Sequence, residues 1–251
     1  MTILRLSLAL VAALGAGAMN SIAGGGTLLT FPAIVALGVT PLVANATSTV
    51  ALWPGSLGSM WGYRGELVGA RRWVIGFAVP SVCGGVLGAW LLLHTEPAAF
   101  ARIVPFLVLG ATVLFLVQRP LVRLLNTSHA EWEGPSAGFL MAQFLVAVYG
   151  GYFGAGIGIL MLAALGFMGL TNIHRMNGLK NWGAMCINGA AVVMFVAGGI
   201  VQWPVALTMA AGGVIGGYAG ARLAQRVGQE RVRHAIVVIG LAAFFWLLYH
   251  H

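Results

Sequence analysis

Two glycine-rich segments are the parts of this 251-residue chain best suited to binding an anion through backbone N–H groups. The first is Gly-Gly-Gly-Thr at positions 24–27, and the second is Gly-Ala-Gly-Ile-Gly at positions 154–158. Glycine tolerates the positive φ angles of an anion-binding turn, and a helix that follows adds the positive end of its dipole. The glycines predicted to contact an anion are Gly24, Gly25, Gly26 and Gly156. Close packing of helices is the alternative use of such glycines.

Small polar side chains follow each glycine segment and predict further ligand contacts. Amides and hydroxyls donate hydrogen bonds to anionic oxygens without carrying a charge, and they also satisfy freed backbone groups. The predicted contacts are Asn45, Thr47 and Ser48 after the first segment, and Asn177, Lys180 and Asn181 after the second. Three other polar residues lie inside apolar runs, where hydrogen bonding between helices explains them as well as substrate contact does. They are Asn20, Gln143 and Asn188.

The amino-acid composition of the chain is that of a membrane protein. Hydrophobic residues make up 60% of the chain, charged residues make up 7%, and the mean hydropathy is +0.95. Soluble domains carry about 25% charged residues, so this chain lacks the polar surface of a soluble globular protein. A net charge of +8 in a soluble protein would suggest nucleic acid as a partner, but here the arginines separate apolar runs. We therefore expect a multi-pass protein of the cell inner (plasma) membrane, with lipid as a partner and no nucleic acid.

Lys180 is the only lysine, and no carboxylate lies near it in the sequence. A cation at membrane depth is costly and must face a cavity or a partner, so a substrate anion is its natural counter-charge. The alternative is that Lys180 extends to the inner membrane surface. All five acids are glutamates in predicted loops or at segment ends, so the chain lacks an intramembrane carboxylate for proton or sodium coupling. This favours export, which the inside-negative membrane potential drives for an anion.

No arrangement of residues in the sequence suits catalysis or metal binding. HExxH, an aspartate pair and a Cys/His couple at usable spacing are all missing. The two cysteines, Cys83 and Cys186, lie apart inside apolar stretches. We therefore predict no enzyme activity, no metal and no cofactor.

Ten apolar segments form two similar series. The first series is Leu4–Ile22, Thr27–Leu37, Val43–Tyr63, Trp73–Leu93 and Ile103–Val117, and the second is Ala137–Phe153, Ile159–Met168, Trp182–Val201, Trp203–Leu223 and Ala235–Leu248. Three landmarks recur at shifts of 131, 128 and 130 residues, which predicts a first repeat at 1–120, a polar linker at 121–134 and a second repeat at 135–251. The segment after each glycine break is too short to span a bilayer, so it is a half-helix or one limb of a re-entrant hairpin.

The basic residues predict how the two halves are oriented. With the N-terminus outside and an odd number of crossings per half, Arg5 and Arg102 lie outside and the other eleven of the 13 basic residues lie inside. Four plain crossings per half with the N-terminus inside would leave no such bias. The halves are therefore predicted to be inverted repeats in an all-α polytopic fold, an architecture of secondary transporters whose site lies near the membrane midplane.

Several motifs together resemble one known family. GGGT, Pro32, the Leu-Gly-Val-x-Pro turn (Leu37–Pro41) and ANATST (Ala44–Thr49) are similar to the N-terminal repeat of the TauE/SafE sulfite exporters, also called 4-toluene sulfonate uptake permeases. The second half carries the partner pattern GAGIG at 154–158, then MNGLKNW at 176–182. The resemblance covers essentially the whole chain and implies a carrier of small anions, often sulfite, sulfonates or sulfur-containing organic acids. The second glycine motif departs from the family pattern because it is interrupted.

These observations predict a secondary transporter of a small anion, most simply sulfite or an organosulfonate, working as an exporter. The predicted site lies near the midplane and is formed by the broken helices of both repeats. An anion-selective channel is the alternative, because glycine-lined breaks and polar rings can also conduct. The identity of the anion and the oligomeric state are open at this stage.

Overall fold

The computed structural model describes the backbone of residues 3–22, 25–125, 134–168, 170, 172–227 and 229–250. Regular structure in these residues consists of ten α-helices and a short 3-10 turn, without a strand. The prediction of an all-α polytopic membrane fold is confirmed. Within the part of the chain that the structure describes, three helices are long and apolar enough to cross a membrane by themselves, at Arg71–Leu93, Pro97–Val117 and His174–Ala197, and shorter apolar helices accompany them.

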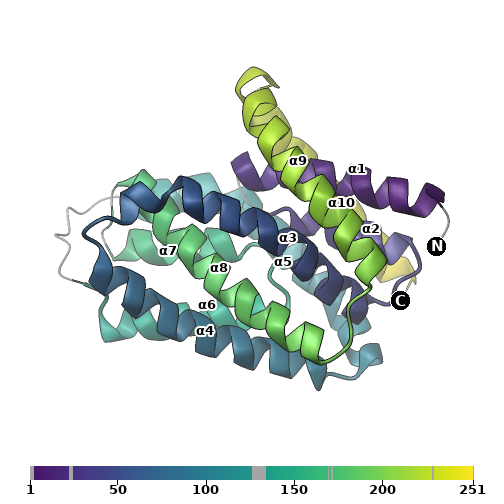
Figure 1. Cartoon of the computed structure of the whole chain (residues 1–251), viewed down its shortest axis with the longest axis horizontal. Helices are drawn as coiled ribbons and strands as arrows, with labels where there is room; N and C mark the ends of the chain where they lie inside the picture. Colours follow the sequence, from purple (N-terminus) through teal and green to yellow (C-terminus); the bar gives the residue numbers. More distant parts are fainter. Residues whose placement is uncertain are drawn as a thin grey trace.

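The helices follow the ten predicted segments in order (Figure 1). The first half contains α1 (Ile3–Ile22), α2 (Thr27–Ala36), α3 (Pro41–Gly62), the 3-10 turn η1 (Arg64–Leu67), α4 (Arg71–Leu93) and α5 (Pro97–Leu125). The second half contains α6 (Ala137–Tyr152), α7 (Ile157–Phe167), α8 (Ile173–Ala197), α9 (Trp203–Val227) and α10 (Gln229–His250). The short helices α2 and α7 stand directly after the two glycine breaks, as the hydrophobic pattern predicts.

Several helix boundaries differ from the prediction, and two of these differences concern the candidate site and the linker. Helix α8 begins at Ile173 instead of Trp182, because the Asn172 side chain caps it by accepting the backbone N–H groups of His174 and Arg175 at 3.0 and 3.2 Å. His174 and Arg175, which fall between two of the predicted apolar segments, therefore lie in the first turn of α8. Helix α5 continues to Leu125, beyond the predicted start of the linker at 121. Positions 126–133 of that linker lie outside the described residues.

The two halves are interlocked by glycine faces. Helix α4 packs on α6, and α9 packs on α1, so the fourth helix of each half lies on the first helix of the other (Figure 1). A Cβ atom on Gly84 of α4 would stand 2.6 Å from the Phe144 carbonyl oxygen, and one on Gly212 of α9 would stand 2.9 Å from the Leu10 carbonyl oxygen. These glycines therefore serve close packing of the helices.

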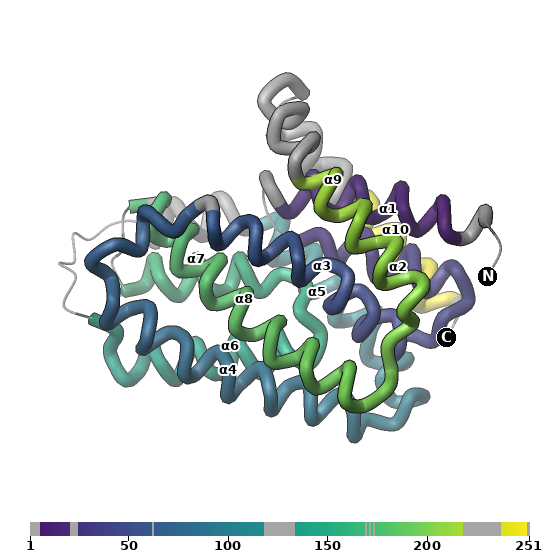
Figure 2. The backbone as a smooth tube through the Cα atoms, in the orientation of Figure 1, coloured from purple at the N-terminus to yellow at the C-terminus, as the bar shows by residue number. Residues whose placement is uncertain are grey.

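Corresponding helices of the two halves run antiparallel where they meet (Figure 2). The Trp53 indole of α3 donates to the Met185 carbonyl oxygen of α8 at 3.2 Å, while Leu67, just after α3, lies against Gly178 near the start of α8. In α5 and α10, Thr112 lies against Gly240, whereas Phe106 pairs edge to face with Phe244 at 6.3 Å between centroids.

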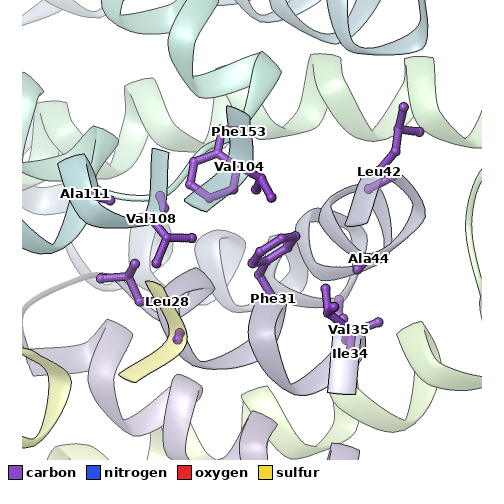
Figure 3. Packing of buried hydrophobic residues seen from close by; sticks show 14 of the residues in the cluster. Leu28, Phe31, Ile34, Val35, Leu42, Ala44, Val104, Val108, Ala111 and Phe153 are labelled. Carbon is purple, nitrogen blue, oxygen red and sulfur yellow. The ribbon is translucent and has the colours of Figure 1, made fainter. Parts of the chain in front are cut away.

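A buried apolar cluster joins the short helix of the first half to the break of the second (Figure 3). The rings of Phe31 in α2 and Phe153, directly after α6, meet edge to face with centroids 5.5 Å apart. Val104 and Val108 of α5 complete this contact, and both are fully buried. Helix α5 therefore forms a shared wall behind both broken regions.

Candidate functional site

A cavity of about 550 Å³ lies between the two halves. Its walls come from the end of α1, both glycine breaks, the second half of α3, the first half of α8 and the middle of α9. Polar side chains on these walls are Asn20, Thr27, Thr49, Ser56, Ser59, Lys180, Asn181 and Asn188. Of the described residues that line the cavity, Lys180 alone carries a charge.

Both glycine breaks reach this cavity, and each has a left-handed backbone that needs glycine. Gly25 has a φ of 91° and Gly156, the residue before α7, has a φ of 80°. Helix α5 lies behind both: a Cβ atom on Gly25 would stand 3.5 Å from the Phe115 ring, and one on Gly156 would stand 3.6 Å from Ala111. The cavity therefore brings together two backbone turns that are about 130 residues apart in the sequence.

The first break is partly satisfied by the protein itself. The Gly26 N–H donates to Asn20 Oδ1 at 2.8 Å, and a Cβ atom on Gly26 would stand 2.8 Å from the Ala16 carbonyl oxygen. Gly26 therefore serves packing and capping of α2, and it does not line the cavity. Gly24, a predicted contact, lies outside the described residues.

The second break presents more free N–H groups to the cavity. Within the described residues, no acceptor bonds the backbone N–H groups of Gly156, which precedes α7, or of Ile157 and Gly158 in its first turn. These residues line the cavity, and α7 is eleven residues long, so the positive end of its dipole faces the cavity.

Lys180 lies directly beside this helix end. Its aliphatic chain lies against Gly158, where an added Cβ atom would stand 3.3 Å from Lys180 Cδ. A cation near the N-terminus of a helix is electrostatically unfavourable, and no carboxylate lines the described walls of the cavity to offset it. The wall around Gly158 is therefore complementary to an anion.

Two amides extend this wall along α8. Asn181 and Asn188 are seven positions apart and share one face of the helix, so both line the cavity. Neither amide has a hydrogen-bond partner within the described residues, which leaves their N–H groups available to a ligand. Asn177, the third predicted polar residue of this segment, is half-buried and does not line the cavity.

The predicted contacts on α3 lie elsewhere. Asn45, Thr47 and Ser48 are buried, and none of them lines the cavity. Asn45 Nδ2 donates to the Tyr152 carbonyl oxygen at 2.9 Å, and Thr47 Oγ1 accepts the Gln202 N–H at 3.1 Å. The Ser48 hydroxyl bonds the Thr30 hydroxyl. Substrate contact by these three residues stays a prediction that their placement does not support.

The cavity is also lined by residues that the sequence analysis did not predict as ligand contacts. Thr49 belongs to the ANATST motif, and Asn20 and Asn188 were conspicuous as polar residues in apolar runs, so a signal existed for these three. Ser56 and Ser59 had none, because serine in a membrane helix commonly bonds its own backbone, as Ser59 does with Gly55 at 3.1 Å.

A protein-family model and several known proteins match this chain over most of its length. The family model described as sulfite exporter TauE/SafE matches residues 9–247. A "Probable membrane transporter protein" of Haemophilus influenzae is 30% identical over 227 residues, covering 88% of this chain and 86% of the relative. The "Probable membrane transporter protein YfcA" of Escherichia coli K12 is 30% identical over 239 residues, covering 93% and 86%. No solved structure gives a significant match.

Proposed function

Because this chain belongs to the TauE/SafE sulfite exporter family and is a multi-pass membrane transporter, we propose that it carries a small anion through the cavity between its two glycine breaks. One observation carries the proposal: Lys180 and the N-terminus of α7 present positive charge to a cavity whose described lining holds no carboxylate. A membrane transporter has a small-molecule substrate, and this electrostatic arrangement supports an anionic one.

The proposed site consists of backbone and side-chain donors around Lys180. The N–H groups of Gly156, Ile157 and Gly158 donate to one side of the anion, and the amides of Asn181 and Asn188 donate to the other. Gly25 and Thr27 of the first break also line this cavity. One cation among uncharged donors suits an anion with a single negative charge, because a second negative charge on the ligand would have no positive partner in the site.

We propose sulfite or a small organosulfonate as the cargo. Sulfur oxyanions present several acceptor oxygens at one centre, which matches donors converging from two helices. A cavity of about 550 Å³ falls in the range of about 300–1,000 Å³ that suits small organic ligands, so an organic tail is accommodated beside Ala51, Leu52 and Val214. The transport step needs no chemical change in the cargo, and we propose no enzyme activity.

Export is the proposed direction. Among the described residues that line the cavity, none is an aspartate or glutamate that could couple uptake to a proton or sodium gradient. The free energy of an anion falls by about 2.3 kcal/mol per elementary charge when it leaves a cell, for each 100 mV of inside-negative potential.

Inverted repeats at residues 1–120 and 135–251, joined by the linker at 121–134, are the proposed framework. The antiparallel pairs α3/α8 and α5/α10 support this relation, as does the exchange of first and fourth helices between the halves. Such a framework lets one half move against the other around a fixed central site.

Counterflow in proteoliposomes tests the function. Vesicles loaded with unlabelled sulfite or sulfoacetate are expected to accumulate labelled anion from outside transiently, because a carrier exchanges its cargo. A membrane potential is expected to drive net anion efflux without a proton gradient. Saturable exchange absent for every sulfur anion, or persistent unitary currents in place of exchange, would refute an anion carrier.

A further inference from the structure

Uncharged side chains in the first turns of α3 form hydrogen bonds to three other parts of the chain. Asn45 bonds the Tyr152 carbonyl at the end of α6, Thr47 bonds the Gln202 N–H in the α8–α9 connection, and Ser48 bonds Thr30 in α2. All three side chains are buried, with exposed fractions of 0 or 1%. We name Asn45, Thr47 and Ser48 together the α3 latch.

The latch lies in the first turns of α3, before the residues of this helix that line the cavity. The cavity follows α3 from Thr49 to Ser59, where Gly55 and Gly58 have nothing within 4 Å of an added Cβ atom. This direction leads to the end of the molecule that carries Arg64, Arg71, Arg72 and Arg175, which we name the basic end. On the other side of Thr49, the chain from Ala44 to Ser48 is buried without a gap.

Contacts around the latch close that second end. Gly198 at the end of α8 packs against Leu93 at the end of α4, where an added Cβ atom would stand 2.7 Å from Leu93 Cδ2. The Tyr152 hydroxyl lies 3.4 Å from the Thr95 hydroxyl, just after α4. Four helix ends therefore meet at the latch, whereas Gly55 and Gly58 further along α3 have open space beside them.

We propose that the α3 latch is the gate on the side opposite the basic end, and that it opens when the cavity becomes accessible from that side. The proposal rests on the carrier function, because only alternating access requires one end to close while the other is open. It assigns conformational control, in place of substrate contact, to three polar residues of α3.

The chemistry of the latch suits a reversible closure. Hydrogen bonds between uncharged groups contribute little net stability each, so a few of them can be exchanged during a transport cycle. Asn45 Oδ1 is buried and has no hydrogen-bond partner among the described residues. An unpaired buried oxygen destabilises the closed arrangement, which keeps its free energy near that of an open one.

Thiol labelling from each membrane face tests the latch. Cys83→Ala and Cys186→Ala remove the native thiols, and Ser56→Cys places one reporter in the cavity. A membrane-impermeant maleimide is applied separately to either face of reconstituted vesicles, and a separate protein with Arg64→Cys identifies the basic end. With an intact latch, the reporter is expected to react from the basic end.

Weakening the latch should change the membrane face from which the reporter is labelled. Thr47→Val combined with Ser48→Ala is expected to raise labelling from the opposite face about three- to tenfold and to lower it from the basic end. Ser81→Ala is the matched control, because it removes a buried serine hydroxyl at the α4–α6 contact. It is expected to leave both rates unchanged. Latch variants that label like the control would overturn the proposal.

A crosslink gives a second test that does not depend on the double variant folding well. Thr47→Cys with Gln202→Cys is expected to form a disulfide that holds the latch closed and abolishes counterflow of sulfoacetate until a reductant is added. Sulfoacetate is used because sulfite itself cleaves disulfides. Binding of sulfoacetate from the basic end, measured as a rise in Tm, is expected to survive the crosslink. Counterflow at the uncrosslinked rate in the oxidised protein would overturn the latch.

The two proposals fail separately. Labelling of the Ser56→Cys reporter needs no anion, so it decides the latch even when no sulfur anion binds. Absence of anion binding with an unaltered α3 counts against the proposed cargo alone.

Discussion

The side chain of Lys180 lies across Gly158, so that a methyl group at position 158 would stand 3.3 Å from Lys180 Cδ. This contact joins the only lysine of the chain to the first turn of α7. The proposed anion-binding wall of the cavity depends on this one helix pair, α7 and α8.

Gly158→Val should therefore displace Lys180 and weaken anion binding. A contact of 3.3 Å is tight for one carbon, and a branched side chain cannot be accommodated without moving the lysine. We expect at least about a tenfold loss of affinity, equivalent to about 1.4 kcal/mol. Isothermal titration with sulfoacetate measures it. Gly138→Val, in open space on α6, is the control, and equal affinity in both variants would contradict the prediction.

Asn181→Ala and Asn188→Ala should each weaken binding without unfolding the protein. Both amides line the cavity, so each substitution removes a donor to the anion at a cost of about 1–2 kcal/mol, or about 5–30-fold in affinity. Asn177→Ala on the same helix serves as the control, because Asn177 does not line the cavity. A larger effect at position 177 than at 181 and 188 would show that the site is placed wrongly.

Asn20 should separate stability from binding. Asn20→Ala removes the acceptor of the Gly26 N–H and is expected to lower the free energy of unfolding by about 1–2 kcal/mol. Asn20→Asp keeps an acceptor oxygen but adds negative charge to the cavity wall, so it should retain stability and lose anion affinity. Thermal unfolding with and without sulfoacetate distinguishes these outcomes. The same loss of stability in both variants would rule out the capping role.

Gly84→Ala and Gly212→Ala should be destabilising to a similar degree. The added methyl groups would meet backbone oxygens at 2.6 and 2.9 Å, and overpacking of this kind costs about 1–3 kcal/mol. Gly110→Ala is the control, since nothing lies within 4 Å of its added Cβ atom. Unfolding curves in detergent provide the comparison. If Gly84→Ala and Gly212→Ala unfold like the control, the two interlocking contacts do not hold the halves together.

The sequence predicts the fold well because its signals are strong and local. The ten predicted apolar segments correspond to the ten helices of the described residues, and the two predicted glycine breaks lie directly before α2 and α7. The start of α8 was missed because the stretch 173–181 is less apolar than the rest of the helix. A cap at Asn172 and tertiary contacts hold it helical, and hydropathy does not register either.

The candidate site is predictable only in part, since the sequence does not show which turns of a helix face the cavity and which pack against other elements. The rare features, Gly25, Gly156 and Lys180, do meet in one cavity. Asn45 and Thr49 are four positions apart in one motif, yet only Thr49 lines the cavity. Their separation depends on how α3 packs against α6 and the α8–α9 connection, which are contacts between distant parts of the chain.

The most direct test of anion binding is the change in Tm of the purified protein on adding sulfite, sulfoacetate, taurine, sulfate or acetate, compared with Lys180→Met. A ligand that binds only the folded protein stabilises it by about 2.7 kcal/mol at 100 times its Kd. We predict that a sulfur anion raises the Tm of the native protein, that Lys180→Met abolishes this rise, and that Arg72→Met, which removes an exposed charge, preserves it. An equal rise in the Lys180→Met protein would contradict a site built around this lysine.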